Sequence, residues 1–130
     1  MEFPIVIIKE KDSSIYVLDK NNFGLISKGG EAFYNNGDII DSSGRLYQIK
    51  GIENIQSASI LKSLKYFQHM YQVKAFTIFI KQLTLIEFKE LLIQHITSHS
   101  KYWIHRSLIP DLKKEITNKA DYKSVIEFLK

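Results

Sequence analysis

The first half of the chain alternates short apolar runs with clusters of turn-forming residues. The runs are rich in Ile, Val, Tyr and Phe, which favour β-strands, and the clusters hold Asp, Asn, Ser and Gly, which favour tight turns. The cluster at 41–44 ends in glycine between two strand-like runs, as expected of a hairpin. The pattern therefore predicts an antiparallel meander with strands over residues 4–9, 15–18, 23–27, 38–40 and 45–52.

The middle of the chain holds two further segments. Residues 57–70 show helical spacing of apolar side chains, which favours a short helix although nearby serines weaken the pattern. Those side chains are Ile60, Leu61, Leu64 and Phe67. Residues 71–82 are apolar on both faces between Ala75 and Ile80 and are rich in β-forming residues. We expect a central strand here, covered on both sides by other parts of the fold.

A capping box marks the start of a long helix at Leu85. Thr84 can accept a hydrogen bond from the amide of Glu87, whose side chain can reach back to Thr84. Leu83 and Phe88 stand at the two positions of a hydrophobic staple, which supports the same start. One helix face gathers Leu85, Phe88, Leu91, Leu92, His95, Ile96 and His99, and Ile86 and Ile93 form a second stripe. We expect this helix to pack on two sides.

Two shorter helices are predicted to follow. One covers residues 108–117 with Pro110 in its first turn, and the other is opened by Asp121 as N-cap. The last helix has Tyr122, Val125, Ile126 and Leu129 on one face. Together the patterns predict one α+β domain over residues 1–130, with a β-hairpin half (1–56) and a strand-plus-helix half (57–130). In it, an N-terminal antiparallel β-meander and a central strand are covered by C-terminal helices.

Composition agrees with a single globular domain. The chain has 130 residues, of which 45% are hydrophobic and 25% charged, and it has no cysteine. Disulfide scaffolds, cysteine-ligated metals and thiol nucleophiles are therefore excluded. The first residues lack the basic start and long apolar stretch of a signal peptide, and no apolar run approaches the roughly 20 residues of a membrane helix. We expect a cytoplasmic protein that does not enter a membrane.

Charge is distributed unevenly. Residues 1–56 carry six Lys and Arg against eight Asp and Glu, a net charge of −2, while residues 57–130 carry twelve against six, a net charge of +6. Residues 54–86 have no acidic side chain and interleave aromatic residues with Lys62, Lys65, Lys74 and Lys81. Lysines attract phosphates and aromatic rings stack on bases, so this segment offers nucleic-acid binding as an alternative function. In the other interpretation, the aromatic residues belong to the buried core around a strand and the lysines face solvent.

No catalytic or metal-binding pattern stands out. His95 and His99 lie one helical turn apart and could offer two nitrogens to a metal, but Ile96 stands where a metalloprotease helix has its glutamate. We expect these histidines to be partly buried or at an interface. No phosphate-binding glycine loop and no G-x-S-x-G motif is present. We therefore expect neither enzymatic activity, nor a metal, nor a cofactor.

The segment after the long helix carries residue types common at protein interfaces. They are Tyr102, Trp103, His105 and Arg106. These residues are candidates for partner binding. The two aromatic rings could equally close the core beneath the helix end.

The C-terminal half contains the segment QLTLIEFKELLIQHITSHSKYW (82–103) and the closing segment DYKSVIEFL (121–129). In these two segments it resembles small bacterial immunity proteins of polymorphic toxin and contact-dependent inhibition systems. The resemblance implies a protein that protects its cell by binding a cognate toxin directly. Such proteins share no catalytic motif, so no residue role is carried over. For a toxin with a basic cleft, carboxylates in the hairpin turns, above all Asp38 and Asp41, could supply the contacts. The oligomeric state stays open.

Overall fold

The computed structural model describes residues 1–66 and 68–130; Phe67, assigned above to the helical run, lies outside the described residues. The predicted α+β fold with C-terminal helices is confirmed. Strands are β1 (Ile5–Ile8), β2 (Ile15–Leu18), β3 (Leu25–Ser27), β4 (Asp38–Ile40), β5 (Arg45–Ser57) and β6 (Met70–Gln82). Helices are the 3-10 helix η1 (Gly30–Tyr34), α1 (Ile60–Lys65), α2 (Leu85–Ser98), α3 (Ser100–Trp103), α4 (Ile109–Asn118) and α5 (Tyr122–Leu129).

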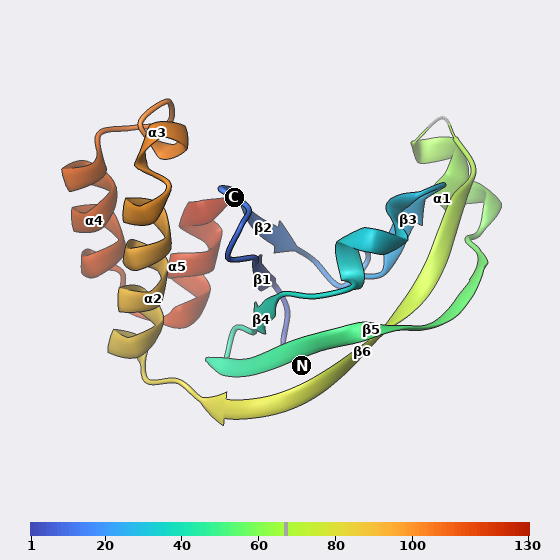
Figure 1. Cartoon of the computed structure of the whole chain (residues 1–130), viewed down its shortest axis with the longest axis horizontal. Coiled ribbons are helices and arrows are strands. Elements are labelled where there is room, and N and C mark those ends of the chain that lie inside the picture. Colours follow the sequence, from blue (N-terminus) through green and yellow to red (C-terminus); the bar gives the residue numbers. More distant parts are fainter. Residues whose placement is uncertain (67) are drawn as a thin grey trace.

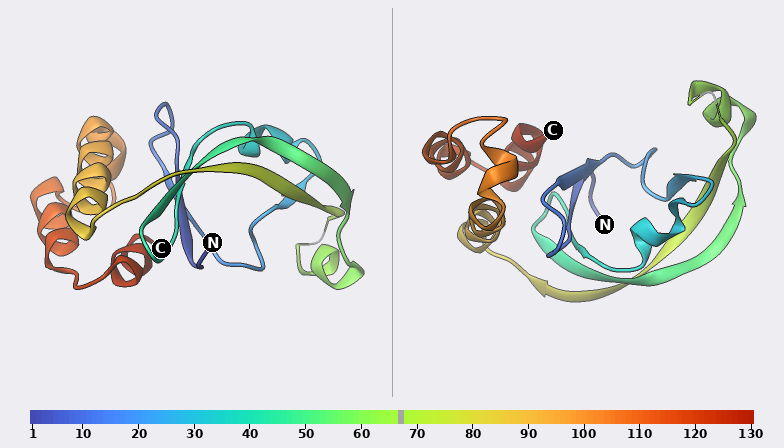
Figure 2. Two further views of the ribbon diagram at one scale, coloured as in Figure 1. Left: turned by 90° about the horizontal axis from the view of Figure 1, so that it is seen from below. Right: turned by 45° about the horizontal axis from the view of Figure 1, so that its top comes forward.

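In the described residues the strands form one antiparallel sheet in the order β2-β1-β4-β5-β6-β3. The sheet curls, so that the long β5–β6 hairpin sweeps around the short N-terminal strands (Figure 1). Helices α2 to α5 gather at one end of this curl, and α1 lies at the far tip of the hairpin (Figures 1 and 2). The predicted antiparallel strands are present, with β5 longer than expected and η1 an addition. They do not form a simple meander, because β1 lies between β2 and β4, and β3 pairs with β6 at the other edge of the sheet.

Two hydrophobic cores lie on opposite faces of the sheet, and β1 contributes to both. Val6 and Ile8 pack in the core beneath the helices, while Ile5 and Ile7 pack in the core inside the curl. All four side chains are buried, because a strand alternates its side chains between faces and both faces are covered here. β1 is therefore covered on both sides, and so is β4, whose Ile40 and Ile39 enter the two cores.

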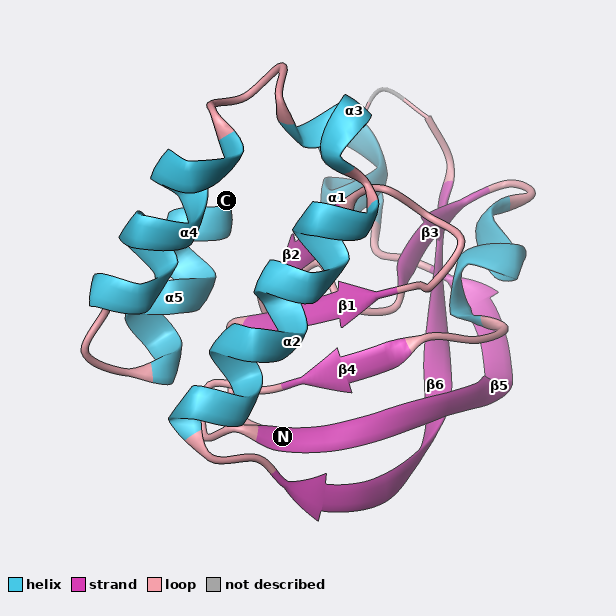
Figure 3. Cartoon of the chain, turned by 60° about the vertical axis from the view of Figure 1, so that its left-hand side comes forward, coloured by secondary structure: helices cyan, strands magenta, loops and turns pink. Residues whose placement is uncertain are grey.

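The prediction that residues 71–82 form a central strand covered on both sides is wrong in burial, although a strand is present. Phe76, Ile78, Phe79 and Ile80 of β6 are 47%, 42%, 55% and 47% exposed. The helices α2 to α5 lie at the end of the sheet with β1, β2 and β4, and the long hairpin extends past them (Figure 3). The α1 side chains Ile60, Leu61 and Leu64 are also exposed. An apolar run without alternation fits burial on both faces and exposure on both faces equally well, and only the neighbouring elements decide.

The predicted start of the long helix is confirmed. Thr84 Oγ1 accepts from the Glu87 amide at 3.1 Å, and the Thr84 amide donates to Glu87 Oε1 at 3.0 Å. Leu83 and Phe88 are both buried in the core beneath the helices. The expected packing on two sides holds only in part, because Ile93 packs against this core while Ile86 is 69% exposed.

The last two helices also begin as predicted. Helix α4 has Pro110 in its first turn, and Asp121 caps α5 by accepting a hydrogen bond from the Ser124 amide at 2.7 Å. Val125, Ile126 and Leu129 of α5 enter the same core as Val6 and Ile8 of β1. This core therefore joins the first strand of the chain to its last helix.

Candidate functional site

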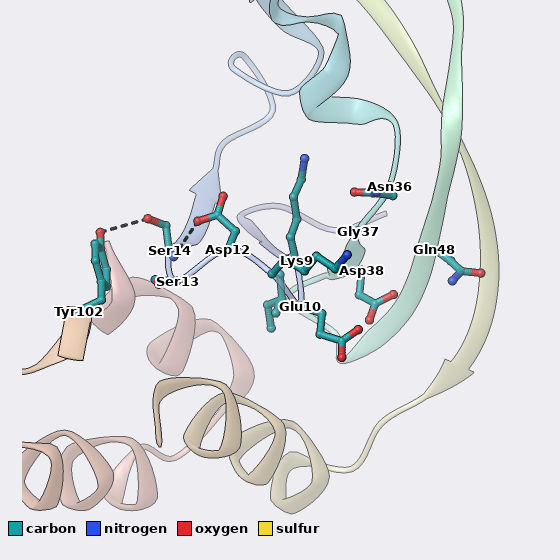
Figure 4. A pocket seen from close by; sticks show the side chains of 12 residues that line it. Lys9, Glu10, Asp12, Ser13, Ser14, Asn36, Gly37, Asp38, Gln48 and Tyr102 are labelled. Atoms are coloured by element: carbon teal, nitrogen blue, oxygen red, sulfur yellow. Dashed lines mark hydrogen bonds between the residues drawn. The ribbon is translucent and has the colours of Figure 1, made fainter. Parts of the chain in front are cut away.

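A pocket of about 810 Å³ opens between the β1–β2 connection and the start of β4. Its lining is mostly polar and includes Lys9, Glu10, Asp12, Asp38, Gln48 and Tyr102 (Figure 4). The antiparallel pairing of Ile8 with Asp38 holds the two sequence segments together. The sheet register therefore builds this pocket from residues that are far apart in the sequence.

Asp38 is the half-buried carboxylate in the pocket whose side chain has no polar partner among the described residues, and the exposed Glu10 carboxylate has none either. No hydrogen bond or ion pair to the Asp38 side chain occurs among the described residues, which exclude Phe67 and the side chain of Asn54. The side chain is half-buried, and this burial raises the pKa of Asp38 above its ordinary value. A partly desolvated carboxylate without a partner gains from a cation brought to it. Figure 4 shows the carboxylates of Asp38 and Glu10 extending to the same side of the pocket.

Two other charged groups of the pocket are engaged within the chain. Lys9 Nζ donates to the carbonyl oxygen of Phe33 and lies 4.3 Å from the centre of the Phe33 ring. Asp12 accepts hydrogen bonds from the Tyr16 hydroxyl and from the Ser14 amide at 3.0 Å. The Tyr16 bond is the main reason that the pKa of Asp12 is lowered. The pocket therefore offers the carboxylates of Asp38 and Glu10 rather than Lys9 or Asp12.

Tyr102 connects this pocket to a second one. Its ring is 50% exposed, and its hydroxyl accepts a hydrogen bond from Ser14 Oγ at 3.0 Å. The second pocket, about 480 Å³, is lined by Tyr102 together with Ser14, His105 and Arg106. Four of the six residues predicted to bind a partner thus line one of these two adjoining pockets and are at least partly exposed. They are Asp38, Tyr102, His105 and Arg106.

The structure gives Trp103 and Arg106 internal roles. Trp103 is 3% exposed, packs in the core beneath the helices, and donates its indole N–H to the Ser13 carbonyl oxygen at 2.8 Å. The core interpretation of this residue is therefore the correct one. Arg106 Nη1 donates to the Leu129 carbonyl oxygen at 3.0 Å, at the C-terminal end of α5. Such a bond satisfies a carbonyl that lacks a partner within the helix.

Asp41 is a correction to the sequence prediction, because it is fully buried and cannot reach a partner. Its carboxylate accepts hydrogen bonds from the amides of Glu2, Ser43 and Arg45, each at 3.0 Å, and from Ser43 Oγ at 2.7 Å. These bonds close the β4–β5 turn and fix the N-terminal segment to it. A turn aspartate can serve its own backbone, and this possibility is the one that holds here.

The two helical histidines are used within the fold. His99 contacts Ser13 Oγ at 3.2 Å through Nδ1 and the Glu10 carbonyl oxygen at 3.0 Å through Nε2. His95 is buried with its ring 4.6 Å from that of His99, and its Nε2 has no hydrogen-bond partner. Among the described residues no group of three or more His, Asp or Glu side chains could hold a metal ion.

The four lysines of the nucleic-acid alternative are spread along the hairpin. Lys62 and Lys65 lie on α1 at its tip, while Lys74 and Lys81 are seven residues apart on β6, about 23 Å measured along the strand at roughly 3.3 Å per residue. Lys74 pairs with Glu53 and Lys81 with Glu87, each at 3.6 Å. The structure thus separates these charges instead of gathering them in one patch.

Comparisons with known proteins return no relative: no family model, no curated protein and no solved structure matches this chain. No helix among the described residues is long and apolar enough to span a bilayer.

Proposed function

We propose that this chain is a non-enzymatic binding protein, an immunity protein that neutralises a cognate bacterial toxin by direct contact. The contact surface is the pair of adjoining pockets that presents Glu10, Asp38, Tyr102 and His105, which we call the acidic–aromatic surface. The single observation that carries the proposal is the half-buried carboxylate of Asp38, which has no partner in the described chain and shares a pocket with the exposed ring of Tyr102.

The chemistry of this surface suits a basic partner. A Lys or Arg side chain of the toxin would pair with Asp38, and the tyrosine ring would pack on the aliphatic part of the same residue. Because Asp38 is already partly desolvated, pairing restores a favourable interaction to a charge that the fold leaves unpaired. Nuclease toxins present basic clefts of this kind, and a bound carboxylate surface would block them by charge and by bulk.

Nucleic-acid binding is the weaker alternative. The lysines that would carry it are spread over the length of the hairpin, and two of them already contact carboxylates. Exposed ion pairs are weak, so they reduce rather than abolish the attraction to phosphate. A steep loss of nucleic-acid affinity with rising salt would favour this function over the proposed one.

The test is co-purification with the product of the adjacent upstream gene, followed by rescue of cells that express that product. We expect a one-to-one complex and rescue. Asp38→Asn and Tyr102→Ala should each weaken the complex at least tenfold, while the matched controls Glu90→Gln on α2 and Tyr66→Ala at the hairpin tip should leave it unchanged. A complex that forms but ignores both pocket substitutions would refute the assigned surface. Failure to bind and to rescue would refute the proposed function for that pair.

A further inference from the structure

Strand β6 has an open edge along most of its length. Strand β3 pairs only with its first three residues, and the last bond on that side runs from the Val73 amide to the Gly24 carbonyl oxygen at 2.8 Å. Among the described residues, no strand pairs with the same edge from Lys74 to Gln82. Figures 1 and 3 show this part of β6 as the lower margin of the sheet.

The direction of the free backbone groups follows from alternation. In an antiparallel strand the N–H and C=O of one residue point to the same side, and this side reverses at each step. Because Val73 donates toward the β3 side, the backbone groups of Ala75, Thr77 and Phe79 point to that side too. The pairing with β5 shifts twice between Val73 and Phe79, but both extra insertions lie on β5, so the alternation along β6 is unbroken. Six backbone groups therefore face outward without a strand to receive them.

The side chains around this edge are apolar, with a lysine near each end. Natural sheets usually protect an open edge with a central charge, a proline or a covering element. The centre of this edge instead holds Phe76, Ile78 and Phe79, each about half exposed. The flanking Lys74 and Lys81 contact Glu53 and Glu87 of the same chain, which offsets their charge. The edge therefore favours pairing with another apolar strand.

We propose that this edge binds a second copy of the chain, by antiparallel pairing of β6 with β6 across a twofold axis at Thr77. Directly opposed residues in an antiparallel pair lie on the same face of the sheet, so their numbers must sum to an even value. Lys74 can therefore never oppose Lys81. The axis at Thr77 joins the outward-pointing residues only to one another, Thr77 to Thr77 and Ala75 to Phe79, which makes six backbone hydrogen bonds.

The neighbouring registers are poorer. An axis at Phe76 would oppose Phe79 to Val73, whose amide is already bonded to Gly24. An axis at Ile78 would oppose Ala75 to Lys81, beyond the irregularity at Ile80, where the pairing with β5 shifts.

Side-chain fit also supports the axis at Thr77. On one face the small Ala75 of one copy lies opposite the large Phe79 of the other, with the two threonines between them. On the other face Phe76 lies opposite Ile78, a favourable aromatic and β-branched pair. Four half-exposed side chains, Phe76, Ile78, Phe79 and Ile80, of about 200 Å² each expose roughly 400 Å² of apolar surface per copy, or about 800 Å² in a dimer. This total is below that of a standard stable interface and is typical of weak, transient association. We therefore expect a reversible dimer whose population rises with concentration.

Cysteine cross-linking tests the register, because the chain has no cysteine of its own. The two copies of a residue on the axis have Cα atoms about 5.5 Å apart, within the disulfide range. The two copies of residue 76, or of residue 78, are in addition offset by two residues, about 7 Å, along the strand. We expect Thr77→Cys to form a disulfide-linked dimer under mild oxidation and Phe76→Cys and Ile78→Cys to form far less. Strong cross-linking at either of the latter positions, or at none, would overturn the register.

Light scattering of the purified chain tests the edge itself. We expect the wild type to shift from monomer to dimer with concentration, and the double variant Phe76→Lys, Ile78→Lys to stay monomeric with an unchanged circular dichroism spectrum. The control Ile86→Lys, on an exposed residue of α2, should dimerise like the wild type. A wild type that stays monomeric at all concentrations would refute the second copy as occupant. So would a β6 edge that pairs only when a toxin strand binds. These readouts use the chain alone and are independent of the proposed immunity function.

Discussion

The indole N–H of Trp103, on α3, donates a hydrogen bond at 2.8 Å to the carbonyl oxygen of Ser13, just before β2. The bond ties the end of the long helix to the β1–β2 connection, which forms one wall of the pocket that holds Asp38. Trp103 is nearly fully buried, so the bond forms where water cannot replace it. The shape of the pocket therefore depends on a core residue.

Trp103→Phe should lower the free energy of unfolding by about 1–3 kcal/mol, because the Ser13 carbonyl loses its donor and the smaller ring leaves a void. Urea unfolding followed by circular dichroism measures this change without relying on tryptophan fluorescence. The control Tyr102→Phe, at the half-exposed neighbouring ring, should stay within about 0.5 kcal/mol of the wild type. Equal effects at the two positions would contradict the internal role of Trp103.

Asp41→Asn should lower the free energy of unfolding by about 1–3 kcal/mol near neutral pH, because an amide has one oxygen for a site with several donors. Burial raises the pKa of Asp41, but the hydrogen bonds from Glu2, Ser43 and Arg45 outweigh it and leave the pKa below its ordinary value. A lowered carboxyl pKa gives stability that is present above about pH 4 and is lost on acidification.

Urea titrations at several pH values measure this difference between wild type and Asp41→Asn. We expect it to shrink as the pH falls below about 4. The exposed control Glu90→Gln should show no such convergence. A gap that stays constant with pH would argue against a charged Asp41 in the turn.

His95 should make stability depend on pH near neutrality. Burial, and then the neighbouring His99, lower the pKa of His95, while the backbone of Ser13 and Asp12 and the Asp12 carboxylate act in the opposite direction. The unfolded chain therefore takes up the proton more readily, and stability falls as the pH drops below about 6.5. His95→Leu should remove most of this slope between about pH 7.5 and 5.5, measured by urea unfolding. The control His105→Gln, at an exposed histidine, should keep the dependence of the free energy of unfolding on pH. If His95→Leu also keeps it, another group is responsible for this dependence.

Asp38→Asn should raise the free energy of unfolding near neutral pH while weakening partner binding. The raised pKa of Asp38 means that the folded state disfavours its charged form. The charged carboxylate therefore lowers the free energy of unfolding of the wild type above that pKa, and this loss disappears as the pH falls and the carboxylate is protonated. The gain in Asp38→Asn should therefore be largest near pH 7 and vanish in acid, as thermal unfolding at several pH values would reveal. A variant that is less stable at pH 7 would show that the fold itself uses the Asp38 charge.

Local sequence signals predicted most of the elements, because each depends on residues close in the chain. The Thr84–Glu87 capping box and the Asp121 cap each satisfy amides within three residues, so their patterns are sufficient to place helix starts. The strands at 15–18 and 38–40 were placed at their observed bounds for the same reason. Burial of the apolar run at 75–80 was not predictable in this way, since it depends on which elements cover β6.

The candidate site was only partly predictable. Tyr102 and His105 were identified from residue type, and Asp38 from its turn, but Glu10 gave no signal of its own. Asp38 and Tyr102 share a pocket only because β1 pairs with β4 and α3 docks against the β1–β2 connection. A turn carboxylate such as Asp41 looks the same in sequence whether it faces solvent or its own backbone. Pairing across the sheet is the information that a single sequence lacks.

The core beneath the helices draws Val6 and Ile8 from the first strand and Val125, Ile126 and Leu129 from the last helix. During synthesis on a ribosome, this core cannot close until residue 129 has emerged, because its final wall is α5. The contacts are long in sequence, so we expect slow folding for a domain of this size. A nascent chain would hold its apolar β1 exposed until then, so the interval between the synthesis of β1 and that of α5 carries a risk of aggregation.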